Sequence, residues 1–209
     1  MYKLYYAPGA CSMCVHIALE WIGEPYEAVR VDPHDPAYLK INPAGAVPAF
    51  DPGDGRILTQ NAAILPFLAA GHPQARLGVD GGPREQAELT RWTAFITGDL
   101  HPAYFPLFGP GRFTTATDED ALKRVRDAAV SVVKANLKLL DARLKEREWI
   151  MGARRTYADA YATPMLDWAT KVIPGGLANF PELARHRRQM LADPAVKTVF
   201  ADEGLTRGA

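Results

Sequence analysis

Cysteine is scarce in this sequence: there are two among 209 residues, and both lie in one short stretch, as Cys11 and Cys14. Two thiols three positions apart cannot build a framework of structural disulfides, and such usage is typical of a reducing compartment. No second pair of cysteines or histidines follows at the spacing that a zinc site needs. We therefore expect no metal ion.

An excess of charge and long apolar runs are also missing. Lysine plus arginine and aspartate plus glutamate both number 24, so nothing favours binding to nucleic acid or to an anionic membrane surface. No apolar run reaches the length of a membrane span, and the first residues lack the pattern of a secretory signal. We expect a cytoplasmic protein without membrane or nucleic-acid partners.

The sequence does hold enough apolar residues for a packed core, at 48%, and its first part reads as alternating strands and helices. A strand at 2–6 is followed by a Pro8-Gly9 turn, a helix at about 11–22 that ends at Gly23, and a second strand at 26–31. Two short strands and a helix from about residue 61 come after a loop. This order predicts a small α/β unit with a mixed sheet.

The second part of the chain has a helical period throughout. Residues 71–83 are rich in Gly, Pro, Asp and Gln, which is typical of a linker between domains. Beyond it we expect four helices at about 84–108, 118–146, 181–192 and 194–201, and one more that starts at a capping box formed by Thr156 and Asp159. The basic cluster at 185–188 is expected on a solvated face. We predict an α/β domain at 1–74 and an all-α domain at 84–209.

Cys11 stands where the first strand turns into the first helix. The unpaired N–H groups and partial positive charge of a helix start favour a thiolate, so we expect a lowered pKa and a reactive thiol at Cys11. Cys14 falls on the apolar stripe of the same helix, which favours core packing. The pair also spells C-x-x-C, which is typical of redox sites when it opens a helix after a strand. The residues alone leave a redox role open.

Five ordered motifs carry a family resemblance. They are KLYYAPGACS at 3–12, NPAGAVP at 42–48, LTQNAAI at 58–64, DLHP at 99–102 and TYAD at 156–159. Over nearly the full length the chain resembles the glutathione S-transferases, and it is most similar to the bacterial beta class.

The resemblance implies a thioredoxin-like N-terminal domain that binds glutathione, an all-helical C-terminal domain with a pocket for the acceptor substrate, and a homodimer. It implies a cis peptide bond before Pro48, so that the backbone N–H and C=O groups of Val47 meet the cysteinyl part of glutathione. Gln60 and Asn61 would hold the γ-glutamyl end, because a helix start is an anion site and asparagine is a good N-cap. The alternative for Asn61 is a cap without a binding role.

The family pattern also implies catalytic roles. Cys11, with Ala10 beside it, would contact the glutathione sulfur, and His101 would approach that sulfur from the second domain. Phe113 and Trp168 would line the acceptor pocket. The alternatives are a structural histidine and a tryptophan of the core.

Three positions depart from the family pattern. Gln60 replaces an acidic residue, Gly98 stands where a serine can contact glutathione, and Pro102 replaces a basic residue. Each change removes a charge or a hydrogen-bond donor, so the resemblance leaves the affinity for glutathione open.

Two uses of the glutathione thiol follow from the resemblance. One is conjugation to apolar small-molecule electrophiles, and the other is exchange with disulfides through Cys11. The alternative from another class is a noncatalytic dimer of the same fold that carries apolar ligands or scaffolds a partner. The lost polar contacts favour that alternative.

Overall fold

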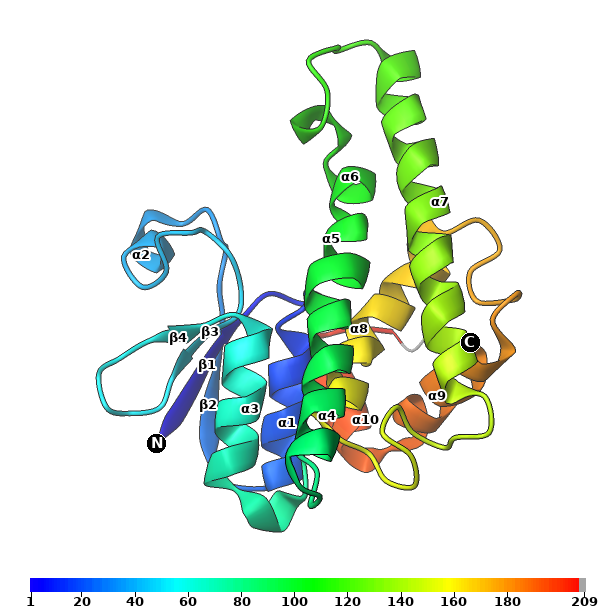
Figure 1. Cartoon of the computed structure of the whole chain (residues 1–209). Coiled ribbons are helices and arrows are strands. Elements are labelled where there is room, and N and C mark those ends of the chain that lie inside the picture. The colour runs from blue at the N-terminus through cyan, green and yellow to red at the C-terminus, as the bar shows by residue number, and fades with distance from the viewer. Residues whose placement is uncertain (207–209) are drawn as a thin grey trace.

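The computed structural model describes residues 1–206, and its first part is built on a four-stranded mixed sheet (Figure 1). The strands are β1 (Tyr2–Tyr6), β2 (Tyr26–Arg30), β3 (Ala49–Asp51) and β4 (Leu58–Thr59), in the spatial order β2-β1-β3-β4. β1 and β2 run parallel, whereas β3 is antiparallel to both β1 and β4. This is the mixed sheet that the sequence predicts.

Helix α1 (Met13–Ile22) is the crossover between the two parallel strands, and its residues from Met13 to Leu19 are all buried. It ends at Gly23, whose φ of 75° lies in the left-handed region and whose N–H donates to Leu19 O. The predicted start of this helix was two residues early, because Cys11 and Ser12 form a turn ahead of it. Cys14 is fully buried, which confirms its predicted place in the core.

Between β2 and β3 the chain forms α2 (Pro36–Leu39) and the loop 42–48. After β4 comes α3 (Asn61–Gly71), in which Asn61 is the first helical residue. The prediction of Asn61 as the N-cap was therefore wrong by one position. Gln60 precedes the helix instead, with a φ of 72° that is rare for a residue with a side chain.

The rest of the chain is helical, as predicted. The expected helix at 84–108 is divided into α4 (Pro83–Phe95), a wide-turned π-helical segment η2 (Ile96–Leu100), α5 (His101–Ala103) and α6 (Phe105–Phe108). Pro102 and Pro106 lack the backbone N–H that would continue a regular ladder, which explains the division. The remaining elements are η1 (Pro73–Ala75), η3 (Pro110–Arg112), α7 (Glu119–Leu144), α8 (Tyr157–Val172), α9 (Pro181–Ala192) and α10 (Pro194–Asp202).

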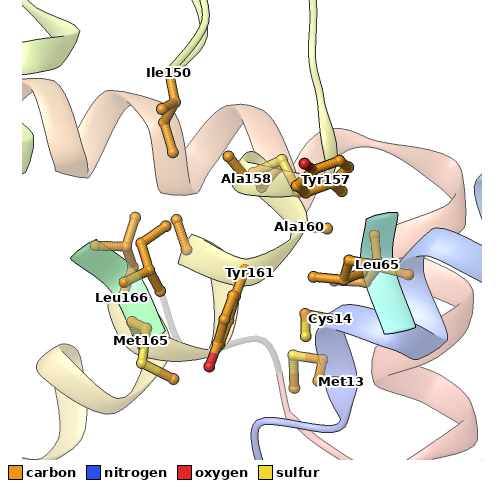
Figure 2. Packing of buried hydrophobic residues seen from close by; sticks show 14 of the residues in the cluster. Met13, Cys14, Leu65, Ile150, Tyr157, Ala158, Ala160, Tyr161, Met165 and Leu166 are labelled. Atoms are coloured by element: carbon orange, nitrogen blue, oxygen red, sulfur yellow. The ribbon is translucent and has the colours of Figure 1, made fainter. Parts of the chain in front are cut away.

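The two parts share one core. Helix α1 lies between the sheet and the helical part, where it packs against α8 and α10. Figure 2 shows Cys14 of α1 and Leu65 of α3 facing Tyr161 of α8, and all three side chains are buried. The division at 1–74 and 84–209 stays a prediction, and the last three residues of the second range lie outside the described residues.

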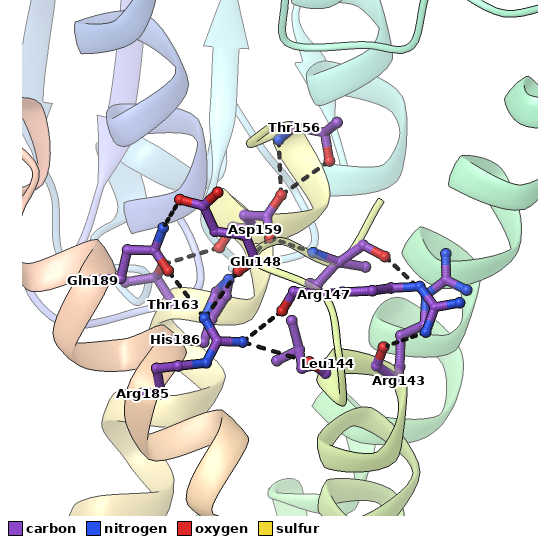
Figure 3. A network of polar contacts seen from close by, with 11 residues as sticks. Arg143, Leu144, Arg147, Glu148, Thr156, Asp159, Thr163, Arg185, His186 and Gln189 are labelled. Atoms are coloured by element: carbon purple, nitrogen blue, oxygen red, sulfur yellow. Dashed lines mark hydrogen bonds and ion pairs between the residues drawn. The ribbon is translucent and has the colours of Figure 1, made fainter. Parts of the chain in front are cut away.

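A buried carboxylate organises the start of α8 (Figure 3). Asp159 accepts hydrogen bonds from the N–H of Thr156 at 2.7 Å, the N–H of Ile150 at 2.9 Å and the His186 ring at 2.9 Å. The predicted capping box between Thr156 and Asp159 is present. The prediction of a solvated face at 185–188 was wrong for His186 and Arg187, which are buried, because His186 reaches Asp159 and Arg187 reaches Asp167.

Candidate functional site

A cavity of about 360 Å³ opens between the loop 42–48 and the helical part of the chain. One wall comes from the first sixty-one residues and the other from η2, α5, α6 and α8. The lining residues are Cys11, Asn42, Ala44, Ala46, Val47, Pro48, Thr59, Gln60, Asn61, Thr97, His101, Pro102, Phe105 and Tyr161. Six of the residues expected to bind glutathione thus surround one space, and Ala10 is not among them.

The thiol of Cys11 lies under the loop, where its Sγ donates to Val47 O at 3.2 Å. Burial raises the pKa of Cys11 to about 11, although hydrogen bonding by Asn61 and by nearby backbone groups opposes this rise. The expected lowering of this pKa was therefore wrong. Cys11 precedes α1 by two residues, and the loss of water around the sulfur outweighs the favourable field of the helix start.

The peptide bond between Val47 and Pro48 is cis, as the resemblance implied. The carbonyl before it, Ala46 O, accepts hydrogen bonds from the Tyr38 hydroxyl and from Asn42 Nδ2, both at 2.6 Å. These two contacts fix the carbonyl of Ala46, and the Cys11 thiol fixes the carbonyl of Val47.

Asn61 is buried and connects α3 to the Cys11 turn. Its Nδ2 donates to Cys11 O at 3.3 Å, whereas its Oδ1 has no partner within residues 1–206. As the first residue of α3, Asn61 is not the N-cap, and its amide connects the start of that helix to the backbone of Cys11. Because buried acceptors are normally satisfied, the orphaned oxygen beside the cavity suits a ligand that carries N–H donors.

His101 lies on the opposite wall, where its Nδ1 is 3.1 Å from the Tyr161 hydroxyl. Burial lowers the pKa of His101 to about 4, so the ring is neutral at neutral pH and acts as a hydrogen-bonding group. Burial also raises the pKa of Tyr161 above its usual range, which keeps the phenol protonated.

The aromatic residues expected for the acceptor pocket lie beyond this cavity. The ring centroid of Trp168 lies 5.3 Å from that of His101 and 5.1 Å from that of Phe108. Its Nε1 donates to Gly9 O at 2.7 Å. Phe113 is exposed at the end of η3, and Phe105 and Phe108 are also exposed. Neither Trp168 nor Phe113 lines the cavity, so their acceptor role stays a prediction.

Several cavity residues escaped the sequence reasoning. Tyr161 of α8 and Thr97 of η2 line the cavity although neither belongs to one of the five sequence motifs. Two residues before His101, Asp99 presents its backbone oxygen to Asn136 rather than to the cavity. Of the departures from the family pattern, Pro102 lines the cavity and Gly98 is exposed with open space around its Cα.

Among the described residues, no group of three or more His, Cys, Asp or Glu side chains could hold a metal ion. Within the same residues, no helix is long and apolar enough to cross a membrane.

Comparison with known proteins places the chain. Residues 1–70 match the family model of the glutathione S-transferase N-terminal domain, and residues 93–194 match that of the C-terminal domain. Glutathione S-transferase GST-4.5 of Xanthomonas campestris is 42% identical over 207 residues, which cover 97% of this chain and 99% of the relative.

Two solved structures are also similar. A sphingomonad glutathione S-transferase complexed with glutathione has a TM-score of 0.85 and 34% identity, covering 98% of this chain and 100% of that one. A bacterial beta class glutathione S-transferase of Sphingomonas chungbukensis has a TM-score of 0.85 and 33% identity with the same coverage. With both domain families matched in order and these likenesses spanning the full fold, this chain belongs to the glutathione S-transferase family and is most like its bacterial beta class.

Proposed function

We propose that the chain is a glutathione transferase that joins the thiol of glutathione to apolar electrophiles. The observation that carries this proposal is the cavity itself. It brings Cys11, the Val47 peptide, Asn61 and His101 together from four separate motifs. Relatives named glutathione S-transferases, one of them complexed with glutathione, support the same activity.

Glutathione fits the polar groups of the first wall. Its γ-glutamyl end would meet Gln60 and Asn61 at the start of α3, where the ammonium and amide N–H groups of the ligand can satisfy Asn61 Oδ1. Its cysteinyl backbone would pair with the N–H and C=O of Val47. That arrangement would direct the sulfur toward Cys11 and His101, which face the same space.

The state of Cys11 favours conjugation over disulfide exchange. With a pKa of about 11, only roughly one Cys11 in ten thousand is a thiolate at pH 7, so this residue is a poor attacking group before ligand binding. As a thiol it can instead turn its single S–H away from Val47 O and donate it to the sulfur of bound glutathione. Neutral His101 and protonated Tyr161 add further polar groups around a developing thiolate.

The electrophile would bind on the aromatic side. Phe108 is exposed next to Trp168, and Phe105 is exposed next to His101; a surface of interchangeable apolar rings suits apolar acceptors of varied shape. Substrates of this class are small-molecule electrophiles, with disulfides as the slower alternative.

A homodimer in the cytoplasm completes the proposal. Exposed Phe67 on α3 and a hollow of about 410 Å³ are surfaces that a second copy could cover; the hollow is lined by Trp92, Phe95, Leu139 and Ala142 together with Arg91 and Arg143. The two free thiols agree with a reducing compartment.

The test is the melting temperature of the reduced protein at increasing glutathione concentration. A ligand that binds only the folded state stabilises it by roughly 2.7 kcal/mol at a hundredfold excess over Kd, so we expect a saturable rise. Asn61→Ala should weaken or abolish the rise. Asn136→Ala is the matched control, because it removes an amide-to-backbone hydrogen bond of 3.0 Å outside the cavity.

Turnover assays with an apolar electrophile then follow. Conjugation should persist in Cys11→Ala at a reduced rate, whereas mixed-disulfide turnover should be lost. A flat melting curve at millimolar glutathione for the unaltered protein would overturn the proposal and favour the noncatalytic ligand carrier.

A further inference from the structure

One carbonyl in the cavity loop receives two strong hydrogen bonds. Ala46 O accepts from the Tyr38 hydroxyl and from Asn42 Nδ2, each at 2.6 Å. Both donor residues are buried, although Ala46 itself is exposed. A carbonyl oxygen has two lone pairs, so both are used, and the Ala46–Val47 peptide plane is held in one orientation.

This orientation decides where the next N–H points. The Ala46–Val47 peptide bond is trans, and in a trans peptide the C=O and N–H groups point in opposite directions. The N–H of Val47 therefore faces away from the two buried donors, and it has no hydrogen-bond partner within residues 1–206. Val47 lines the cavity, and its own carbonyl is held by the Cys11 thiol at 3.2 Å.

Asn42 also braces the loop from a second side. Its Oδ1 accepts from the Ala44 N–H at 3.2 Å while its Nδ2 donates to Ala46 O. The segment from 42 to 46 is thus closed by a single side chain. Tyr38, on α2, provides the second anchor without lining the cavity.

We propose that Tyr38 and Asn42 are positioning residues for glutathione recognition: by fixing Ala46 O, they present the free N–H of Val47 to the cysteinyl carbonyl of the ligand. The inference rests on the proposed function and adds to it the residues that set the geometry of the backbone contact. These residues act on binding, not on the sulfur, because neither is hydrogen-bonded to Cys11 or His101.

Tyr38→Phe is the decisive variant, because it removes one hydroxyl from a residue outside the cavity. We expect the Kd and KM for glutathione to rise about five- to tenfold, the size of one lost hydrogen bond, while kcat at saturating glutathione stays within twofold. Asn42→Ala should raise KM further, because it removes both contacts of the amide. Tyr26→Phe is the control, since its hydroxyl donates to Glu20 at the same 2.6 Å but far from the loop.

The split between KM and kcat separates positioning from simple stability. A structural role would lower the melting temperature of Tyr38→Phe and Tyr26→Phe alike and leave KM unchanged. If unaltered protein binds glutathione and folded Tyr38→Phe keeps its KM within twofold, the inference is wrong. If the unaltered protein itself shows no saturable binding, the proposed function fails instead, so the two failures are distinguishable.

Discussion

At the scale of single residues, the groups that surround a side chain in the fold affect its pKa more than its position in the sequence does. Cys11 lies just before a helix, where the local pattern predicts a lowered thiol pKa, yet the loop 42–48 covers its sulfur and raises that pKa. Val47 of this loop is thirty-six residues away from Cys11 along the chain. The residues around Cys11 do not show that this loop lies over its sulfur. The position of Cys11 before the helix was therefore predictable from the sequence, whereas the pKa of its thiol was not.

The rate of alkylation reports the pKa of the Cys11 thiol. Because only the thiolate reacts, the rate of iodoacetamide modification of Cys11 should increase about tenfold per pH unit between pH 7 and pH 9, without reaching a plateau. The rate is followed by mass spectrometry of the intact protein. Cys11→Ala serves as the control, since the remaining Cys14 is fully buried and should not react. A plateau near pH 7 would show that the helix start, and not burial, governs this thiol.

At the scale of elements, the sequence predicted where helices begin and end, but it did not predict which helices pack against each other. Gly23 at the end of α1 and the capping box at the start of α8 are both present, because such caps depend on residues within one turn. The contact between Asp159 of α8 and His186 of α9 joins residues that are twenty-seven positions apart. The basic residues around His186 are typical of a solvated helix face. The spacing of apolar residues along α9 does not show that α8 packs against this part of the helix.

The start of α8 therefore depends on one carboxylate. Asp159→Ala would leave the N–H groups of Ile150 and Thr156 and the ring of His186 without their acceptor. We expect a loss of about 3 kcal/mol or more in the free energy of unfolding, because each buried donor left without an acceptor costs about 1–3 kcal/mol. Urea denaturation followed by circular dichroism gives the value.

The comparison variant is Asp118→Ala at the start of α7, where the carboxylate accepts one hydrogen bond of 2.8 Å from Ala121 N. A lost cap of this kind costs about 1 kcal/mol. Equal losses in the two variants would mean that the contacts to Ile150 and His186 add nothing to the cap.

At the scale of the whole molecule, the end of the described chain returns to its beginning. Glu203, just after α10, accepts from the Gly9 N–H at 2.8 Å and contacts His16 Nδ1 at 3.1 Å in the interior. Trp168 holds the carbonyl of the same glycine. The mixed sheet and the helical second part were predictable from periodicity, but these contacts across the molecule were not, because each joins residues more than 150 positions apart.

Removing Glu203 should loosen this closure. In Glu203→Ala the N–H of Gly9 and the ring of His16 lose a buried acceptor, and we expect the free energy of unfolding to fall by about 1–3 kcal/mol. The midpoint of thermal unfolding should shift equally by far-ultraviolet dichroism and by tryptophan fluorescence, since the two parts share one core. Glu182→Ala, which removes a half-buried pair with Arg185, is the control. Separate midpoints for the two probes would contradict a shared core.

The two-walled cavity has a consequence for how such a protein can change over generations. The cavity wall with the polar groups proposed for glutathione comes from residues before position 62. The wall with His101, Phe105 and Tyr161 comes from residues after position 96. Substitutions in the later stretch that spare His101 and Tyr161 can reshape the acceptor surface while the earlier stretch keeps its backbone contacts. On the proposed function, a lineage could acquire new electrophiles through drift or recombination in one half of the gene, without rebuilding its hold on glutathione.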